Sequence, residues 1–202
     1  RFPVEVTALE FLAFLRIHGN QFNGTLHTEI GQLSLLQEFM IFNNEFNGTI
    51  PTEIGTMSSM TDLILFGNKL TGTIPEEIYN LTYLFRLDVY DMSGINGTIS
   101  TAIGNLGRLE QFRIRETSMT GTVPTELGLC SSLQLAWLHL NELSGSMPQS
   151  VCELRGNVGS GRLAFLQADC AGLPVPFECD ADCCTSCCDR DGKLCLPTGQ
   201  QE

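Results

Sequence analysis

Apolar and polar positions repeat along this chain with a period of 24 or 25 residues. Most periods contain three apolar residues in the spacing apolar-x-x-apolar-x-apolar. The apolar-x-apolar part alternates with a period of two, which is typical of a short strand with one buried face. The sequence therefore predicts one short strand in each period. The six regular copies are Leu12/Leu15/Ile17, Leu36/Phe39/Ile41, Met60/Leu63/Leu65, Leu84/Leu87/Val89, Leu109/Phe112/Ile114 and Leu133/Ala136/Leu138.

An asparagine follows the strand pattern in most copies. Its side chain both donates and accepts, so we expect it to bond backbone groups of its own turn and of the next repeat. In the fourth copy the asparagine is lost and one residue is inserted around Met92-Ser93-Gly94, and in the fifth Thr117 stands in its place. The asparagines at this position are Asn20, Asn44, Asn68 and Asn141.

The rest of each period centres on a glycine, which a short helix follows. Pro51, Pro75 and Pro124 suit the first turn of such a helix, and the glutamate two residues later suits its positive end. Further glycines such as Gly31 and Gly55 are expected to let the chain bend back. A fixed period of this length predicts a solenoid in which each repeat stacks on its neighbours. The central glycines are Gly24, Gly48, Gly72, Gly97, Gly121 and Gly145.

The two ends depart from the repeat in different ways. Phe2-Pro-Val-Glu-Val6 matches Ile50-Pro-Thr-Glu-Ile54, so the sequence opens in the middle of a repeat. We expect upstream repeats or another subunit to cover this end. After Cys152 the period breaks, residues 155–161 suggest an inserted loop, and Leu163/Leu166/Ala168 resume the strand pattern once. The sequence thus predicts a solenoid over residues 1–170 and a cysteine-rich C-terminal cap over residues 171–202.

Nine cysteines are present, and eight of them cluster at the C-terminal end. Cys130 occupies an apolar position of the repeat and is expected to be a buried free thiol. The other eight suit about four disulfides, with 105 possible pairings. The spacing of Cys184 and Cys187 also suits zinc, but adjacent cysteines without a nearby histidine favour disulfides. These eight are Cys152, Cys170, Cys179, Cys183, Cys184, Cys187, Cys188 and Cys195.

The pattern Leu-x-x-Leu-x-Leu-x-x-Asn-x-Leu-x-Gly-x-Ile-Pro, in register over about residues 2–170, resembles the plant-specific leucine-rich repeat. That family includes receptor-kinase ectodomains and polygalacturonase-inhibiting proteins. The cysteine-rich tail is similar to the ends of secreted repeat proteins of diatoms and related algae. The resemblance implies an α/β solenoid with a concave parallel β-sheet, short extended segments, and short 3-10 or α helices on the convex side.

The net charge and the glycosylation sequons limit the classes of partner and the cellular locations to expect. The net charge of −12 argues against nucleic-acid binding, because phosphate contacts need basic patches. No apolar run is long enough to span a bilayer. Four Asn-x-Thr sequons are candidate glycosylation sites and favour a secreted or cell-surface protein. They begin at Asn23, Asn47, Asn80 and Asn96.

The strand residues between the buried ones are expected to form the concave face. Among them, Met40, Phe42, Ile64, Phe66 and Tyr90 predict one contiguous apolar patch, and exposed patches of this kind mark interaction sites. The alternative is that upstream residues cover this face or that the patch is incidental. The predicted partner-binding residues are Arg16, His18, Met40, Phe42, Ile64, Phe66, Asp88, Tyr90, Arg113, Arg115, Trp137 and His139.

We find no catalytic or metal-binding constellation and expect no cofactor, since the three histidines have no paired nucleophile. The leading hypothesis, which the resemblance implies, is a non-enzymatic extracellular module that binds a protein or polysaccharide with its concave face. The first alternative is a structural subunit of an extracellular or cell-wall assembly. The second is ice binding by the rows of threonine and asparagine beside the central glycines, for which the simpler explanation is that threonine suits extended backbone.

Overall fold

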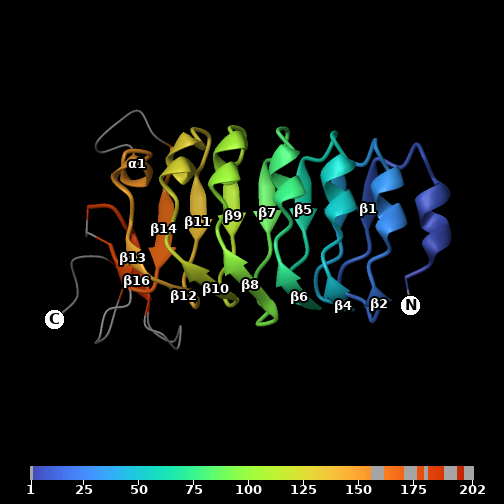
Figure 1. Ribbon diagram of the computed structural model, residues 1–202, viewed down its shortest axis with the longest axis horizontal. Helices are drawn as coiled ribbons and strands as arrows, with labels where there is room; N and C mark the ends of the chain where they lie inside the picture. The colour runs from blue at the N-terminus through green and yellow to red at the C-terminus, as the bar shows by residue number, and fades with distance from the viewer. Residues whose placement is uncertain (1, 156–161, 171–176, 180–181, 189–194, 198–202) are drawn as a thin grey trace.

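The computed structural model describes residues 2–155, 162–170, 177–179, 182–188 and 195–197. The repeats stack side by side into one elongated array, with the two ends of the chain at opposite ends of it (Figure 1). Each repeat contributes a strand, a second extended segment and a short helix, in that order. The solenoid predicted from the period is therefore confirmed.

The main sheet has nine strands, and every neighbouring pair is parallel except the last, β16 with β17. Its register follows the repeat, so that Phe39 lies between Leu15 and Leu63 on the adjacent strands. In order the strands are β1 (Phe14–Arg16), β3 (Glu38–Met40), β5 (Asp62–Ile64), β7 (Arg86–Asp88), β9 (Gln111–Arg113), β11 (Leu135–Trp137), β14 (Phe165–Ala168), β16 (Ser186–Cys188) and β17 (Cys195–Pro197).

A second, six-stranded parallel sheet flanks the first. Its strands are β2 (Asn23–Thr25), β4 (Glu45–Thr49), β6 (Lys69–Thr73), β8 (Ile95–Thr98), β10 (Ser118–Gly121) and β12 (Glu142–Leu143). Two further strands, β13 (Gly145–Ser146) and β15 (Phe177–Glu178), pair with each other.

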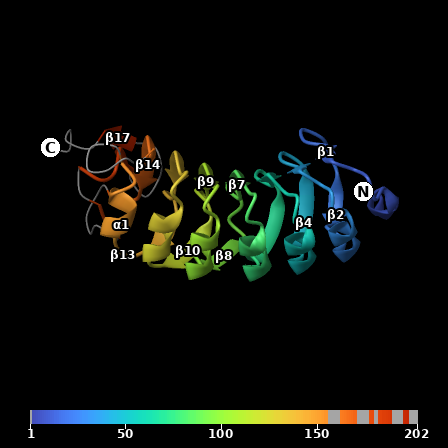
Figure 2. The ribbon, with the colours of Figure 1, turned by 90° about the horizontal axis from the view of Figure 1, so that it is seen from above.

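Short helices line the side opposite the main sheet, as the view from above shows (Figure 2). The sequence pattern predicted Pro51, Pro75 and Pro124 in the first turn of a helix. In the structure they are the N-cap residues, one position earlier. The helices are 3-10 in six repeats and α in the last: η1 (Val4–Ala8), η2 (Thr28–Gln32), η3 (Thr52–Thr56), η4 (Glu76–Asn80), η5 (Thr101–Asn105), η6 (Thr125–Leu129) and α1 (Gln149–Cys152).

The helix glycines have a different role from the one predicted. Gly31 lies inside η2 and does not have the positive φ of a bend, whereas central glycines such as Gly72 do, at +83°. A Cβ atom on Gly31 would lie 2.7 Å from the carbonyl oxygen of Glu53 in the next repeat. Glycine is needed there because successive helices pack backbone to backbone, and the expectation of a bend was wrong.

From Gly48 onward, each central glycine packs against the threonine of the preceding repeat. A Cβ atom on Gly48 would lie 2.9 Å from the methyl carbon of Thr25, and one on Gly97 would lie 2.9 Å from that of Thr73. The threonine methyl thus fills the space that the missing side chain leaves. This packing accounts for the regular Gly-Thr pairs of the flanking sheet without a binding role.

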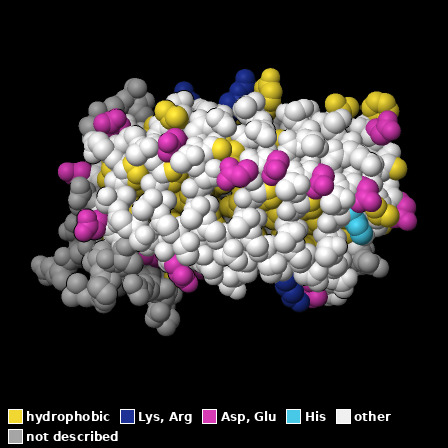
Figure 3. All heavy atoms as spheres, viewed as in Figure 1, with side chains coloured by type: hydrophobic (Ala, Val, Ile, Leu, Met, Phe, Trp, Pro, Cys, Tyr) yellow, Lys and Arg dark blue, Asp and Glu magenta, His cyan; other side chains and the backbone are white. Residues whose placement is uncertain are grey.

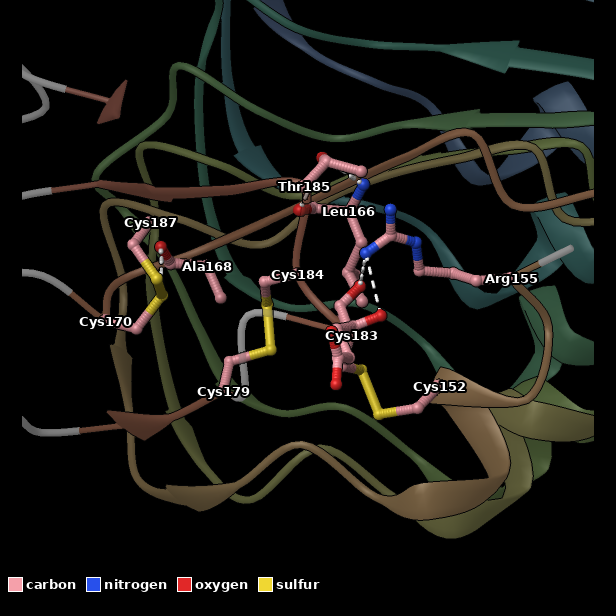
Figure 4. Close-up of a disulfide and its surroundings, with 11 residues drawn as sticks. Cys152, Arg155, Leu166, Ala168, Cys170, Cys179, Cys183, Cys184, Thr185 and Cys187 are labelled. Carbon is pink, nitrogen blue, oxygen red and sulfur yellow. Dashed lines mark hydrogen bonds between the residues drawn. A yellow bond between two sulfur atoms is a disulfide. The ribbon is translucent and has the colours of Figure 1, made fainter. Parts of the chain in front are cut away.

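Disulfides tie the C-terminal segment to the last repeat (Figure 4). Cys152 pairs with Cys183, Cys170 with Cys187, and Cys179 with Cys184; Cys188 is also disulfide-bonded. The zinc alternative for Cys184 and Cys187 is therefore excluded. Arg155 adds hydrogen bonds to the backbone carbonyls of Asp182 and Cys183. Residues 156–161 of the predicted loop and the side chain of Cys195 lie outside the described part of the chain.

Cys130 is a free, buried cysteine. Its thiol lies 3.3 Å from the carbonyl oxygen of Ile103, and burial raises its pKa to about 12. A thiol with that pKa stays protonated and unreactive at neutral pH.

Candidate recognition site on the concave face

A column of stacked rings runs along the concave face, one ring from each of four successive repeats. His18 lies 4.2 Å from Phe42 between ring centroids, Phe42 lies 4.6 Å from Phe66, and Phe66 lies 4.3 Å from Tyr90. The interplanar angles are 7°, 14° and 9°, so the rings are almost parallel. The repeat places each of these residues two positions beyond the end of β1, β3, β5 or β7, at the same point of successive repeats, and this produces the stack.

Arginines and the single tryptophan continue this column. The guanidinium of Arg115 lies over the Tyr90 ring at 4.9 Å, and that of Arg113 lies over Trp137 at 4.7 Å. Trp137 also meets Tyr90 edge to face at 6.3 Å. Cation–π contacts with tryptophan and tyrosine fix both partners in position. The result is a continuous surface of rings and guanidinium groups from His18 to Trp137.

Three of the predicted site residues are buried and cannot contact a partner. Ile64 is 3% exposed, Asp88 is 1% exposed and His139 is 7% exposed. The prediction that they face solvent was wrong, because neighbouring side chains on the curved sheet cover them. The other predicted residues are reachable: Arg16 and His18 are exposed, and Met40, Phe42, Phe66, Tyr90, Arg113, Arg115 and Trp137 are half-buried.

The repeat pattern also contains a charged column that the sequence analysis missed. Glu38, Asp62 and Arg86 occupy the first position of strands β3, β5 and β7, two residues before the predicted column. The sequence signal that could have identified them is the same period of two, continued two residues further towards the N-terminus of each strand. All three form ion pairs: Glu38 pairs with Arg16, and Asp62 pairs with Arg86 at 3.7 Å. In the adjacent column, Arg113 pairs with Asp88 at 2.8 Å.

The predicted glycosylation sites lie away from the concave face. Asn23, Asn47 and Asn96 are exposed on strands β2, β4 and β8 of the flanking sheet. Asn80 is exposed at the end of η4 on the helical side. Acidic side chains form a row over the helices in the space-filling view (Figure 3), which places much of the negative charge on the convex side.

Residues 59–81 match the family model described as Leucine Rich Repeat. They span β5, β6 and η4 in full, and the same order of two strands and a helix recurs in the repeats on both sides. The chain is a leucine-rich repeat protein. No curated protein matches it closely by sequence.

Several solved structures share this leucine-rich repeat fold. The plant peptide hormone receptor RGFR1, solved in complex with RGF2, is 30% identical over 93% of this chain, with a TM-score of 0.75. The ectodomain of the Arabidopsis thaliana receptor kinase GASSHO1/SCHENGEN3, in complex with CASPARIAN STRIP INTEGRITY FACTOR 2, is 30% identical over 89%, with a TM-score of 0.74. A plant ice-binding protein is 23% identical over 82%, with a TM-score of 0.68, which shows the fold alone.

This leucine-rich repeat chain is shorter than the proteins it resembles. It covers 29% of the RGFR1 chain, 20% of the GASSHO1/SCHENGEN3 chain and 50% of the ice-binding chain. In the described ranges, no helix is both long and apolar enough to cross a bilayer. No group of three or more His, Cys, Asp or Glu side chains among those same residues is arranged to hold a metal ion.

Proposed function

We propose that this leucine-rich repeat chain is an extracellular recognition module that binds a polypeptide partner on its concave face, between β1 and β11. The observation that carries this proposal is the column His18–Phe42–Phe66–Tyr90, which is accessible and apolar on a strand face that would otherwise be polar. Aromatic residues, methionine and arginine are the common anchors of protein interfaces. RGFR1, named above, is a peptide hormone receptor solved in complex with RGF2, and this supports a polypeptide partner.

The orientation of the rings favours a polypeptide over a polysaccharide. Sugars bind aromatic side chains by packing against an open ring face. Here the faces of Phe42 and Phe66 are covered by the neighbouring rings, and an arginine covers a face of Tyr90. The column therefore presents ring edges, which carry the positive end of the ring quadrupole. Backbone carbonyl oxygens and apolar side chains of a polypeptide complement such edges.

The charges of the concave face are balanced, although the chain as a whole carries −12. The arginines of the face are paired with carboxylates: Arg16 with Glu38, Arg86 with Asp62, Arg113 with Asp88 and Arg115 with Glu116. We infer that affinity comes mainly from the rings, and that long-range attraction of basic partners is a property of the acidic convex side.

An extracellular setting is supported by two independent features. Disulfides persist in oxidising compartments, and this chain uses at least three of them to hold its C-terminal end. The four sequons are exposed and lie off the concave face, so glycans at those positions would leave the ring column open. We do not propose ice binding, because one threonine row packs against the central glycines, and Thr71 and Thr120 of the other row donate hydrogen bonds to the carbonyls of Gly48 and Gly97.

The test is to pan a displayed random-peptide library against the purified chain and to screen it in parallel on an oligosaccharide array. Selected peptides should lose binding to the double variant Phe42→Asp/Phe66→Asp and keep it with Tyr83→Asp, a matched change of an exposed aromatic outside the column. Peptides that bind the double variant as well as the original chain would contradict the site. Oligosaccharides as the only ligands would contradict the partner class.

A further inference from the structure

Asp88 is buried beneath the recognition surface and pairs with a residue that is part of it. Register places Asp88, Arg113 and Trp137 side by side at the third position of β7, β9 and β11. The Arg113 guanidinium donates from Nη1 to Asp88 Oδ2 at 2.8 Å and from Nη2 to Gln111 Oε1 at 2.7 Å. The guanidinium carbon of Arg113 lies 4.7 Å from the centroid of the Trp137 ring. Asp88 is itself buried, so it affects the recognition surface through its ion pair with Arg113.

A carboxylate at this place is unfavourable for the fold. Asp88 Oδ1 and Arg113 Nε are both buried without a hydrogen-bond partner among the described residues. Burying such groups costs free energy that an apolar side chain would not cost. The two preceding repeats have Met40 and Ile64 at the same position of the strand, so the sheet itself does not need a charge there. The acidic group must therefore be explained by what it holds.

We propose that Asp88 is a positioning residue for the concave recognition face, which holds Arg113 in the orientation that clamps Trp137 against the ring column. This inference rests on the proposed function for its biological meaning, but the arrangement exists without a partner. Losing the Asp88 charge frees Arg113 from its counter-ion, and Trp137 then loses the nearer of the two guanidinium groups over its ring, while that of Arg115 remains at 5.6 Å. The end of the ring column nearest β11 becomes mobile and more accessible to solvent.

Proton uptake by Asp88 supplies a way to switch this clamp. The charged and titratable groups that face it are Asp62 on β5, Arg86 and Tyr90 on its own repeat, and Arg113 on β9. Burial raises the pKa of Asp88 to about 6, and the nearby guanidinium groups of Arg113 and Arg86 only partly offset this effect. The clamp is therefore expected to be closed at pH 7.5 and released by pH 5.

Trp137 is the only tryptophan in the chain, so its emission reports on the clamp directly. The experiment measures Trp137 emission and acrylamide quenching of the purified chain from pH 7.5 to pH 5, with no partner present. The original chain should show one transition centred near pH 6, with stronger quenching at the acidic end. Asp88→Asn should show strong quenching already at pH 7.5 and no transition.

Two matched variants separate this effect from other titrations on the same face. Glu38→Gln makes the same carboxylate-to-amide change in an ion pair two strands away, and His18→Gln removes the imidazole at the far end of the ring column; both should keep the transition. A flat profile for the original chain, which requires no variant to fold, overturns the proposal. So does an unchanged transition in Asp88→Asn. Because no partner is used, failure of the peptide selection and failure of the clamp are separate results.

Discussion

The side-chain oxygen of Asn68 accepts a hydrogen bond from the backbone N–H of Phe46, 3.0 Å away in the preceding repeat. The side-chain nitrogen of Asn68 donates to the carbonyl of Ile41, also in the preceding repeat, at 3.1 Å. Asn68 is buried, so water does not replace either bond. One side chain thus satisfies two backbone groups of its neighbour and couples successive repeats.

Asn68→Ala should therefore be strongly destabilising, by about 2–4 kcal/mol, because the buried N–H of Phe46 loses its acceptor and the carbonyl of Leu65 loses its donor, whereas the Ile41 carbonyl keeps its bond from Asn44. Equilibrium denaturation by urea measures the loss. The matched control is Asn20→Ala, since Asn20 is exposed and bonds only to carbonyls of its own repeat, those of Ile17 and His18. That change should cost about 1 kcal/mol or less. Equal losses in the two variants would contradict the ladder.

The helix glycines offer a second test of the stacking. In Gly128→Ala the new methyl would lie 2.7 Å from the carbonyl oxygen of Ser150, which is backbone and cannot move aside. The expected cost is about 1–3 kcal/mol, typical of overpacking. Gly107→Ala is the control, because nothing lies within 4 Å of its Cβ position and its φ is not in the left-handed region. It should be neutral or slightly stabilising. Similar changes in melting temperature for Gly128→Ala and Gly107→Ala would contradict the close-packing explanation.

The ring column could be predicted because it depends only on the repeat. Once the strands are in register, His18, Phe42 and Phe66 must lie at the same position just beyond neighbouring strands and on one face. The burial of Asp88 could not be predicted in this way. It depends on how Arg113 and other long side chains from adjacent strands fold over it, and the alternation of apolar and polar positions carries no information about side-chain conformation.

The role of the helix glycines and the pairing of the cysteines could not be predicted from the sequence pattern either. A glycine after a helix most often marks a bend, and only the distance between neighbouring helices shows that Gly31 is needed for close approach. Cysteine positions predict a disulfide-rich end but leave the pairing open, because the pairing follows from where residues 177–179 and 182–188 lie against the last repeat. Long-range geometry of this kind is absent from a one-dimensional pattern.

The end formed by the first repeat should be prone to association. Phe11 is 87% exposed and Leu9 is 53% exposed, beside the unpaired outer edge of β1. We predict that the purified chain self-associates with rising concentration, and that Leu9→Ser/Phe11→Ser is monomeric, by size-exclusion chromatography with light scattering. Leu129→Ser removes an equally exposed apolar side chain from η6 and should leave association unchanged. A monomer at all concentrations would count against the structural-assembly alternative.

Two buried groups of the concave face should make opposite contributions to stability as the pH falls. Burial raises the pKa of Asp88 from 3.8 to about 6, so between those values the folded chain binds the extra proton and gains stability on acidification. Burial, with a smaller effect of Arg115, lowers the pKa of His139 from 6.5 to about 4, so the unfolded chain binds the proton and stability is lost on acidification. The two effects largely cancel between pH 6.5 and pH 4.5.

Single variants should reveal each contribution in thermal melts at several pH values. Asp88→Asn leaves the His139 effect alone, so its stability should fall from pH 6.5 to pH 4.5, by on the order of 2 kcal/mol. His139→Gln should do the reverse and gain stability over the same range. Glu38 does not confuse the result, because its pKa is lowered by the hydrogen bond from Arg16 and its contribution is lost only at lower pH. If stability changes with pH in both variants as it does in the original chain, then neither group titrates as its burial requires.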